Sequence, residues 1–81
     1  MASHWEYGRF LDGLSNEELR NEFREVAGTK DILTQCYNTK RDGGWLTLSD
    51  CVIQDHKMEK VNSQIRQILS AMENRGTTLL S

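Results

Sequence analysis

Four side chains in this chain of 81 residues are of the types that bind transition metals: His4, Cys36, Cys51 and His56. Zinc sites usually present such ligands in closely spaced pairs, and the chain has no C-x-x-C or H-x-x-x-H pair. Cys51 and His56 lie five positions apart, which would separate them by about 140° around a helix. We therefore expect no metal site and no cofactor.

Covalent catalysis would need a cysteine or serine beside a base, held in a pocket. Cys51 could meet His56 only if a helix were distorted there, and Asp50 with Asp55 has a spacing typical of a solvated helix face. The sequence also lacks a phosphate-binding glycine loop and a G-x-S-x-G elbow. We expect that the chain is not an enzyme.

A possible nucleic-acid-binding pattern lies between Leu19 and Arg41, where Gly28 separates two helical stretches in the outline of a helix-turn-helix. Polar and basic side chains on the second stretch would then contact phosphates and base edges. These residues are Lys30, Gln35, Asn38, Lys40 and Arg41. However, the first stretch is acidic, and the net charge of −2 comes from interspersed charges of both signs. DNA binding by a dimeric helix-turn-helix regulator is therefore the alternative function.

The strongest periodic pattern runs from about residue 50 to 75, without proline or glycine. Two series of positions, each with a spacing of seven, form the a and d register of a packed helix. The series are Cys51, Met58, Ile65, Met72 and Gln54, Val61, Ile68, Arg75. Val52, Ile53 and Leu69 widen the stripe toward the broader face of a helix in a globular core. The pattern predicts one long C-terminal helix.

The apolar centre of this stripe is either the core of the domain or a docking face. It offers more apolar surface than three short helices need for cover, and thioether side chains suit adaptable contacts. The residues that we expect to bind a partner are Met58, Val61, Ile65, Ile68 and Met72.

Shorter helices are predicted before the stripe. Ser3 with Glu6 fits a capping box, and this first helix should break at Gly13. Ser15 with Glu18 forms a second capping box, which opens the next helix.

A glycine also predicts where the next helix ends. Gly28 should end the second helix in a left-handed conformation, and Thr29 should cap a third that runs to near Lys40. Residues 45–48 then read as a short extended connector, with Trp45 and Leu48 packed on the core.

The bounds of the long helix follow from its flanks. Ser49 or Asp50 should cap its start, and Gly76 should end it. Residues 76–81 are then a frayed tail.

Length and composition limit the remaining possibilities. A chain of 81 residues is expected to form a single domain over residues 1–81, of marginal stability unless it associates. Its two cysteines are expected to be free thiols, although one bridge between them would be possible. No apolar run approaches the roughly 18 residues of a membrane span, and the N-terminus has no signal pattern. We expect a cytoplasmic protein without a membrane partner.

The expected fold is therefore all-α: a small bundle of three short helices packed on one long C-terminal helix. The expected function is a non-enzymatic protein–protein interaction module, such as an adaptor, an accessory factor or an inhibitor of a larger protein. It would act by helix packing, with a homodimer as the simplest case.

Overall fold

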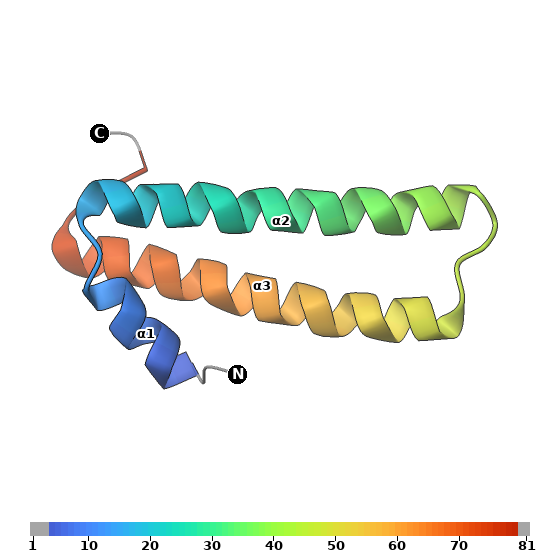
Figure 1. The fold of residues 1–81 in the computed structure, drawn as a ribbon, viewed down its shortest axis with the longest axis horizontal. Coiled ribbons are helices and arrows are strands. Elements are labelled where there is room, and N and C mark those ends of the chain that lie inside the picture. The colour runs from blue at the N-terminus through green and yellow to red at the C-terminus, as the bar shows by residue number, and fades with distance from the viewer. Residues whose placement is uncertain (1–3, 80–81) are drawn as a thin grey trace.

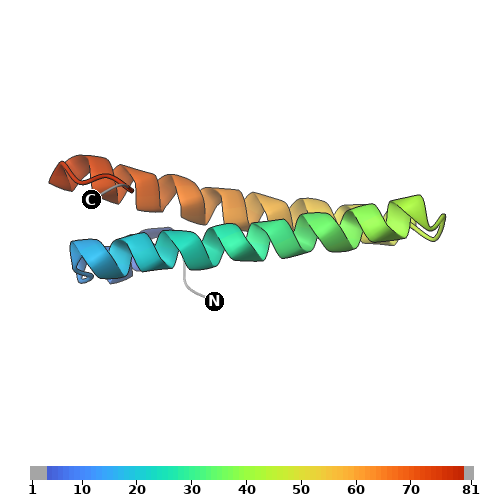
Figure 2. The ribbon, with the colours of Figure 1, turned by 90° about the horizontal axis from the view of Figure 1, so that it is seen from above.

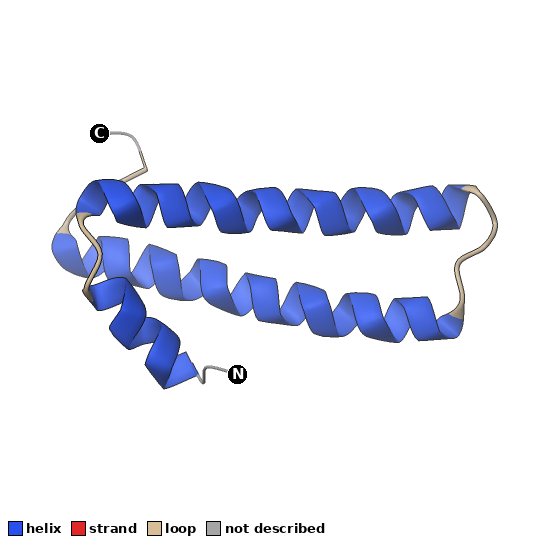
Figure 3. Ribbon diagram, in the orientation of Figure 1, coloured by secondary structure: helices blue, strands red, loops and turns tan. Residues whose placement is uncertain are grey.

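The computed structural model describes residues 4–79, and every regular element in this part of the chain is a helix. The helices are α1 (His4–Asp12), α2 (Asn16–Asp42) and α3 (Leu48–Arg75) (Figure 1, Figure 3). The all-α class is confirmed. The arrangement differs from the expected one, because one short helix accompanies two long ones.

The two long helices form an antiparallel hairpin, and α1 packs beside the C-terminal part of α3 (Figure 1). The molecule is elongated, with extents of 45 × 27 × 15 Å. Figure 2 shows the long helices crossing at a shallow angle, as expected when regularly spaced seams pack together.

The predicted break at Gly28 is wrong, because α2 continues through it. Glycine inside a helix costs about 1 kcal/mol relative to alanine. Packing on α3 offsets this cost, since the inner side of α2 has apolar residues on both sides of the glycine: Phe23 and Val26 before it and Leu33 after it. The second and third predicted helices are therefore one.

The start of α3 also differs from the prediction. Thr47 is the N-cap, and its hydroxyl accepts a hydrogen bond from the Asp50 amide while the Asp50 carboxylate accepts one from the Thr47 amide. Ser49 and Asp50 are therefore inside the helix, and Leu48 is its first residue rather than part of an extended connector. Trp45 and Leu48 are exposed instead of packed on the core.

Two other helix ends agree with the sequence. Ser15 and Glu18 form the predicted capping box. Gly76 ends α3 with φ of +69°, a left-handed conformation that glycine adopts without strain. The predicted box at Ser3 lies outside the described residues, as do residues 80 and 81 of the predicted tail.

The beginning of the tail has contacts with α2. The guanidinium of Arg20 donates hydrogen bonds to the carbonyl oxygen of Thr78 and to the hydroxyl of Thr77. These contacts join the first turns of α2 to the chain that follows α3.

A second arginine fixes α1. The guanidinium of Arg75 donates hydrogen bonds to the carbonyl oxygens of Leu11, Asp12 and Leu14, the first two at 2.8 and 3.2 Å. Leu11 and Asp12 belong to the last turn of α1, where the carbonyl groups have no partner within the helix. Nearer the start of α1, the hydroxyl of Tyr7 donates a hydrogen bond to Glu22 of α2 at 3.0 Å.

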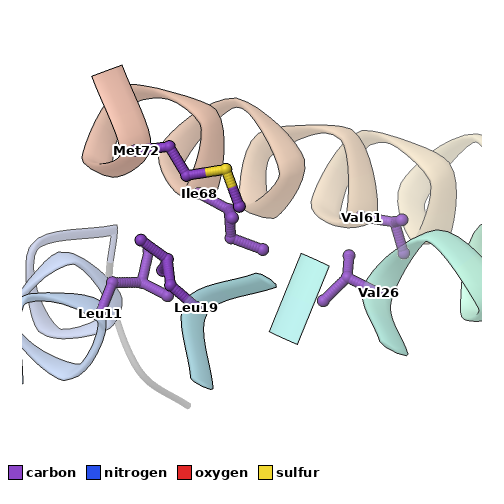
Figure 4. Close-up of a cluster of buried hydrophobic side chains, with 6 residues drawn as sticks. All are labelled: Leu11, Leu19, Val26, Val61, Ile68 and Met72. Atoms are coloured by element: carbon purple, nitrogen blue, oxygen red, sulfur yellow. The ribbon is translucent and has the colours of Figure 1, made fainter. Parts of the chain in front are cut away.

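The buried residues lie in the half of the hairpin away from the connecting loop, and Figure 4 shows the six apolar side chains among them. All three helices contribute to this apolar core, and its members are Leu11, Leu19, Val26, Val61, Ile68 and Met72. Between residues 27 and 60 no residue is buried. We call residues 27–60, which include the connecting loop, the distal half, and we call residues 4–26 with 61–79 the proximal half.

Candidate interaction surface

The predicted apolar stripe of α3 faces α2 and α1 within the same chain. Val61, Ile68 and Met72 are buried in the core, while Met58 and Ile65 are half-buried. A partner could therefore reach three of the five predicted contacts only if the hairpin opened. Their role in binding a partner stays a prediction.

The predicted nucleic-acid contacts lie on one uninterrupted helix, so the turn of a helix-turn-helix is absent from residues 19–41. Lys30, Gln35 and Lys40 are each five positions apart, about 140° around a helix, and so do not share one face. The ammonium group of Lys40 lies 3.0 Å from the Asp50 carboxylate.

The distal half exposes large apolar side chains from both long helices and from the loop. Ile32 on α2 is 62% exposed and Ile53 on α3 is 51% exposed. The complete set in this half is Ile32, Trp45, Leu48, Val52 and Ile53. The proximal half also exposes Phe10, Leu69 and Leu79, but these lie around a core that the chain has already formed.

Part of this set continues the face of α3 on which α1 lies. Ser70 and Ala71 line a shallow cleft of about 220 Å³ between α1 and α3. Val52 and Ile53 precede them by eighteen positions, which is five full helical turns, so the two pairs share one face. α1 lies only against the C-terminal part of α3 (Figure 1). Val52 and Ile53 lie on the uncovered part.

On α2, Ile32 and Cys36 are four positions apart and therefore neighbours on one face. Both side chains are exposed. We define the distal surface as Ile32 and Cys36 on α2 together with Val52 and Ile53 on α3.

Several polar contacts join the two long helices in the distal half. The Gln54 amide donates to the carbonyl oxygen of Leu33 at 3.3 Å, and the Tyr37 hydroxyl lies 3.8 Å from the Cys51 sulfur. The hydrogen bond with Cys51 raises the pKa of Tyr37 above its usual value. These contacts and the ion pair of Lys40 join the helices without forming an apolar core.

Among the described residues, no group of three or more His, Cys, Asp or Glu side chains could hold a metal ion. Cys36 and Cys51 are free thiols, so no bridge joins them. None of the helices between residues 4 and 79 has the length and apolarity to cross a membrane.

The positions of two residues in the sequence indicate the distal surface. Val52 and Ile53 fall outside the a and d series, and the sequence analysis assigns them to a wider core-facing stripe. The structure places the series itself toward α2, so residues beyond it point away from the hairpin unless a further helix covers them. In the proximal half α1 is that helix, and in the distal half no described segment is.

Comparisons of the chain with protein-family models, with curated proteins and with solved structures give no match.

Proposed function

We propose that this chain is a small non-enzymatic protein–protein interaction module, acting as an adaptor, an accessory factor or an inhibitor of a larger protein. It works by helix packing, and its docking site is the distal surface. The observation that supports the proposal is that residues 27–60 expose five large apolar side chains and contain no buried residue.

The energetics favour an occupant of this surface. Complete burial of a large aliphatic side chain contributes about 1.5–3 kcal/mol, so covering the exposed half of Ile53 contributes on the order of 1 kcal/mol. Several such side chains on two adjacent helices offer apolar contacts of the kind that a helix of a partner uses.

The predicted stripe extends this site at its edge. Met58 and Ile65 are half-buried, so a helix laid on the hairpin could touch them without disturbing the core. Contacts by Val61, Ile68 and Met72 would require the hairpin to open, and the proposed docking mode does not use them.

The alternative of a helix-turn-helix regulator has no specific observation in its favour. α2 runs without a turn through Gly28, and Lys40, one of the proposed phosphate contacts, pairs with Asp50. We therefore do not propose it as a second function.

The experiment is an affinity capture from host extract, divided into nuclease-treated and untreated halves, with three forms of the chain: wild type, Ile53→Asp and Leu69→Asp. Leu69 is the matched control, because it is an exposed aliphatic residue of the same helix outside the distal half. We expect wild type and Leu69→Asp to retain the same protein, a second copy of this chain included, and Ile53→Asp to retain at least about tenfold less.

Equal capture by all three forms would contradict the proposed docking site. Loss of every captured protein on nuclease treatment alone would contradict protein–protein interaction and favour nucleic acid.

A further inference from the structure

We propose that α1 (His4–Asp12) is a strap that opens and closes on a hairpin which stays folded without it, and that Arg75 holds the strap closed. The inference concerns the proximal half and does not depend on the proposed docking site.

The apolar core depends little on the strap. Of the six buried apolar side chains, α1 supplies only Leu11, and the other five come from the two long helices. The neighbour of Leu11 on the strap, Phe10, is 52% exposed. Removal of α1 therefore leaves most of the core in place between α2 and α3.

The strap has little helical stability of its own. It has 9 residues, and isolated helices shorter than about 12–15 residues are marginal in water. Gly8 lies at its centre, where glycine disfavours a helix. Among the described residues, a Cβ at position 8 would meet only the side-chain oxygen of Gln67, at 3.9 Å, so no close packing requires this glycine. The strap is helical because it is docked, and opening should unfold it.

Arg75 contacts both sides of the hinge, which is the short segment between α1 and α2. On the strap, its guanidinium donates hydrogen bonds to the carbonyl oxygens of Leu11 and Asp12. Beyond the first hinge residue it donates to the carbonyl oxygen of Leu14, and it lies 3.5 Å from the side-chain oxygen of Asn16. The last two contacts can persist when α1 leaves. The guanidinium then stays in position to bind the end of the strap again.

The strap is held at both ends by polar contacts that water can replace. Near its start, the hydroxyl of Tyr7 donates to the half-buried Glu22 of α2, and at its end Arg75 binds the carbonyl oxygens. Because water takes over such hydrogen bonds on opening, each opposes opening only modestly. The α3 residues that line the cleft under the strap are also mostly polar: Gln67, Ser70, Ala71 and Asn74.

The test is amide hydrogen exchange of the complete chain at a series of low urea concentrations, for wild type, Gly8→Ala, Gly28→Ala and Arg75→Ala. In wild type, we expect the amides of residues 9–12 to be at least about tenfold less protected than those around Leu19 and Ile68. Their exchange should also depend less on urea, because opening the strap exposes less surface than unfolding the hairpin.

Two of the variants act on the strap itself. Gly8→Ala raises the helix preference of α1 and should slow exchange of residues 9–12 about fivefold. Arg75→Ala removes the charge-assisted hydrogen bonds and should accelerate it about 30-fold.

Gly28→Ala is the matched control in α2, where an added Cβ would meet no described atom within 4 Å. It should slow exchange around Leu19 and Ile68 about fivefold, because those amides exchange when the hairpin unfolds. Exchange of residues 9–12 should stay unchanged, since α2 remains helical when the strap opens.

Two results would overturn the strap. If residues 9–12 matched the amides around Ile68 in protection and were slowed equally by Gly28→Ala, α1 would unfold only together with the hairpin. If protection fell gradually toward His4 and Arg75→Ala left the Asp12 amide unaffected, α1 would fray from its start instead of opening as a unit.

Discussion

The proximal and distal halves of the hairpin contain the same two helices but are held together in different ways. The proximal half has a third helix, six buried apolar side chains and the contacts of Arg20 and Arg75. The distal half has polar contacts between its helices and apolar side chains on the outside. The comparison shows that two amphipathic helices can be positioned by a core in one half and leave apolar side chains exposed in the other.

The largest expected difference between the halves comes from one pair of matched substitutions. Ile68→Ala removes a side chain with 0% exposure and should lower the free energy of unfolding by about 3 kcal/mol. Ile32→Ala removes the same side chain from an exposed position and should cost less than about 0.5 kcal/mol in dilute solution. Urea denaturation of both variants measures the difference, and similar losses would refute the division into halves.

Arg75 tests how α1 is attached to the proximal half. Arg75→Ala removes charge-assisted hydrogen bonds to the carbonyl oxygens of Leu11, Asp12 and Leu14 and should cost about 2 kcal/mol. Amide exchange in α1 should accelerate as the helix detaches.

Arg20→Ala is the control, because it frees only the tail at Thr77 and Thr78. Its cost should stay below about 1 kcal/mol. If amide exchange in α1 were equally fast in the two arginine variants, Arg75 would not hold α1 in place.

Each half contains one capping box at the start of a long helix, and removing each box compares the stability of the two halves. Ser15→Ala should lower global stability by about 1 kcal/mol, since its helix leads directly into the core. Thr47→Ala should mainly accelerate amide exchange in the first turns of α3, with less than about 0.5 kcal/mol of global effect, because no buried contact depends on those turns. Equal global losses would show that the distal half unfolds together with the core.

The smallest expected effects are those of pH on the two capping carboxylates. Hydrogen bonds from the amide and hydroxyl of Ser15 lower the pKa of Glu18, and hydrogen bonds from Lys40 and then Thr47 lower the pKa of Asp50. A lowered folded-state pKa contributes stability that is present above the unfolded value and is lost as pH falls through the lowered one.

We therefore expect each contribution to disappear as pH falls below about 4. Carboxyl carbon chemical shifts, followed by NMR, measure both titrations. Titration of Glu18 or Asp50 at its ordinary pKa would show that the corresponding box does not form in solution.

Helix ends with strong capping signals could be predicted from the sequence. Ser15 with Glu18 and the glycine at position 76 act locally, and their chemistry is complete within a few residues. The start at Thr47 was missed because its box uses Asp50 in place of the more typical glutamate or glutamine.

The number of helices could not be predicted from such local signals. Gly28 disfavours a helix by intrinsic preference, and the packing of Val26 and Leu33 against the core offsets that preference. Lys30 is half-buried on the inner side of α2, and this charged residue interrupts the apolar periodicity across Gly28 in the sequence.

The candidate site was difficult to predict for a related reason. The a and d register of α3 was correct as a packing seam, but periodicity alone does not show whether a seam packs within the chain or on a partner. The location of the distal surface depends on α1, which packs on the C-terminal part of α3 and leaves Val52 and Ile53 uncovered.

The most direct test of the central claim is amide hydrogen exchange of the wild-type chain in dilute solution. The account predicts that residues 27–42 and 48–60 exchange rapidly, while the amides around Leu19 and Ile68 are strongly protected. Equal protection of the two halves would contradict it.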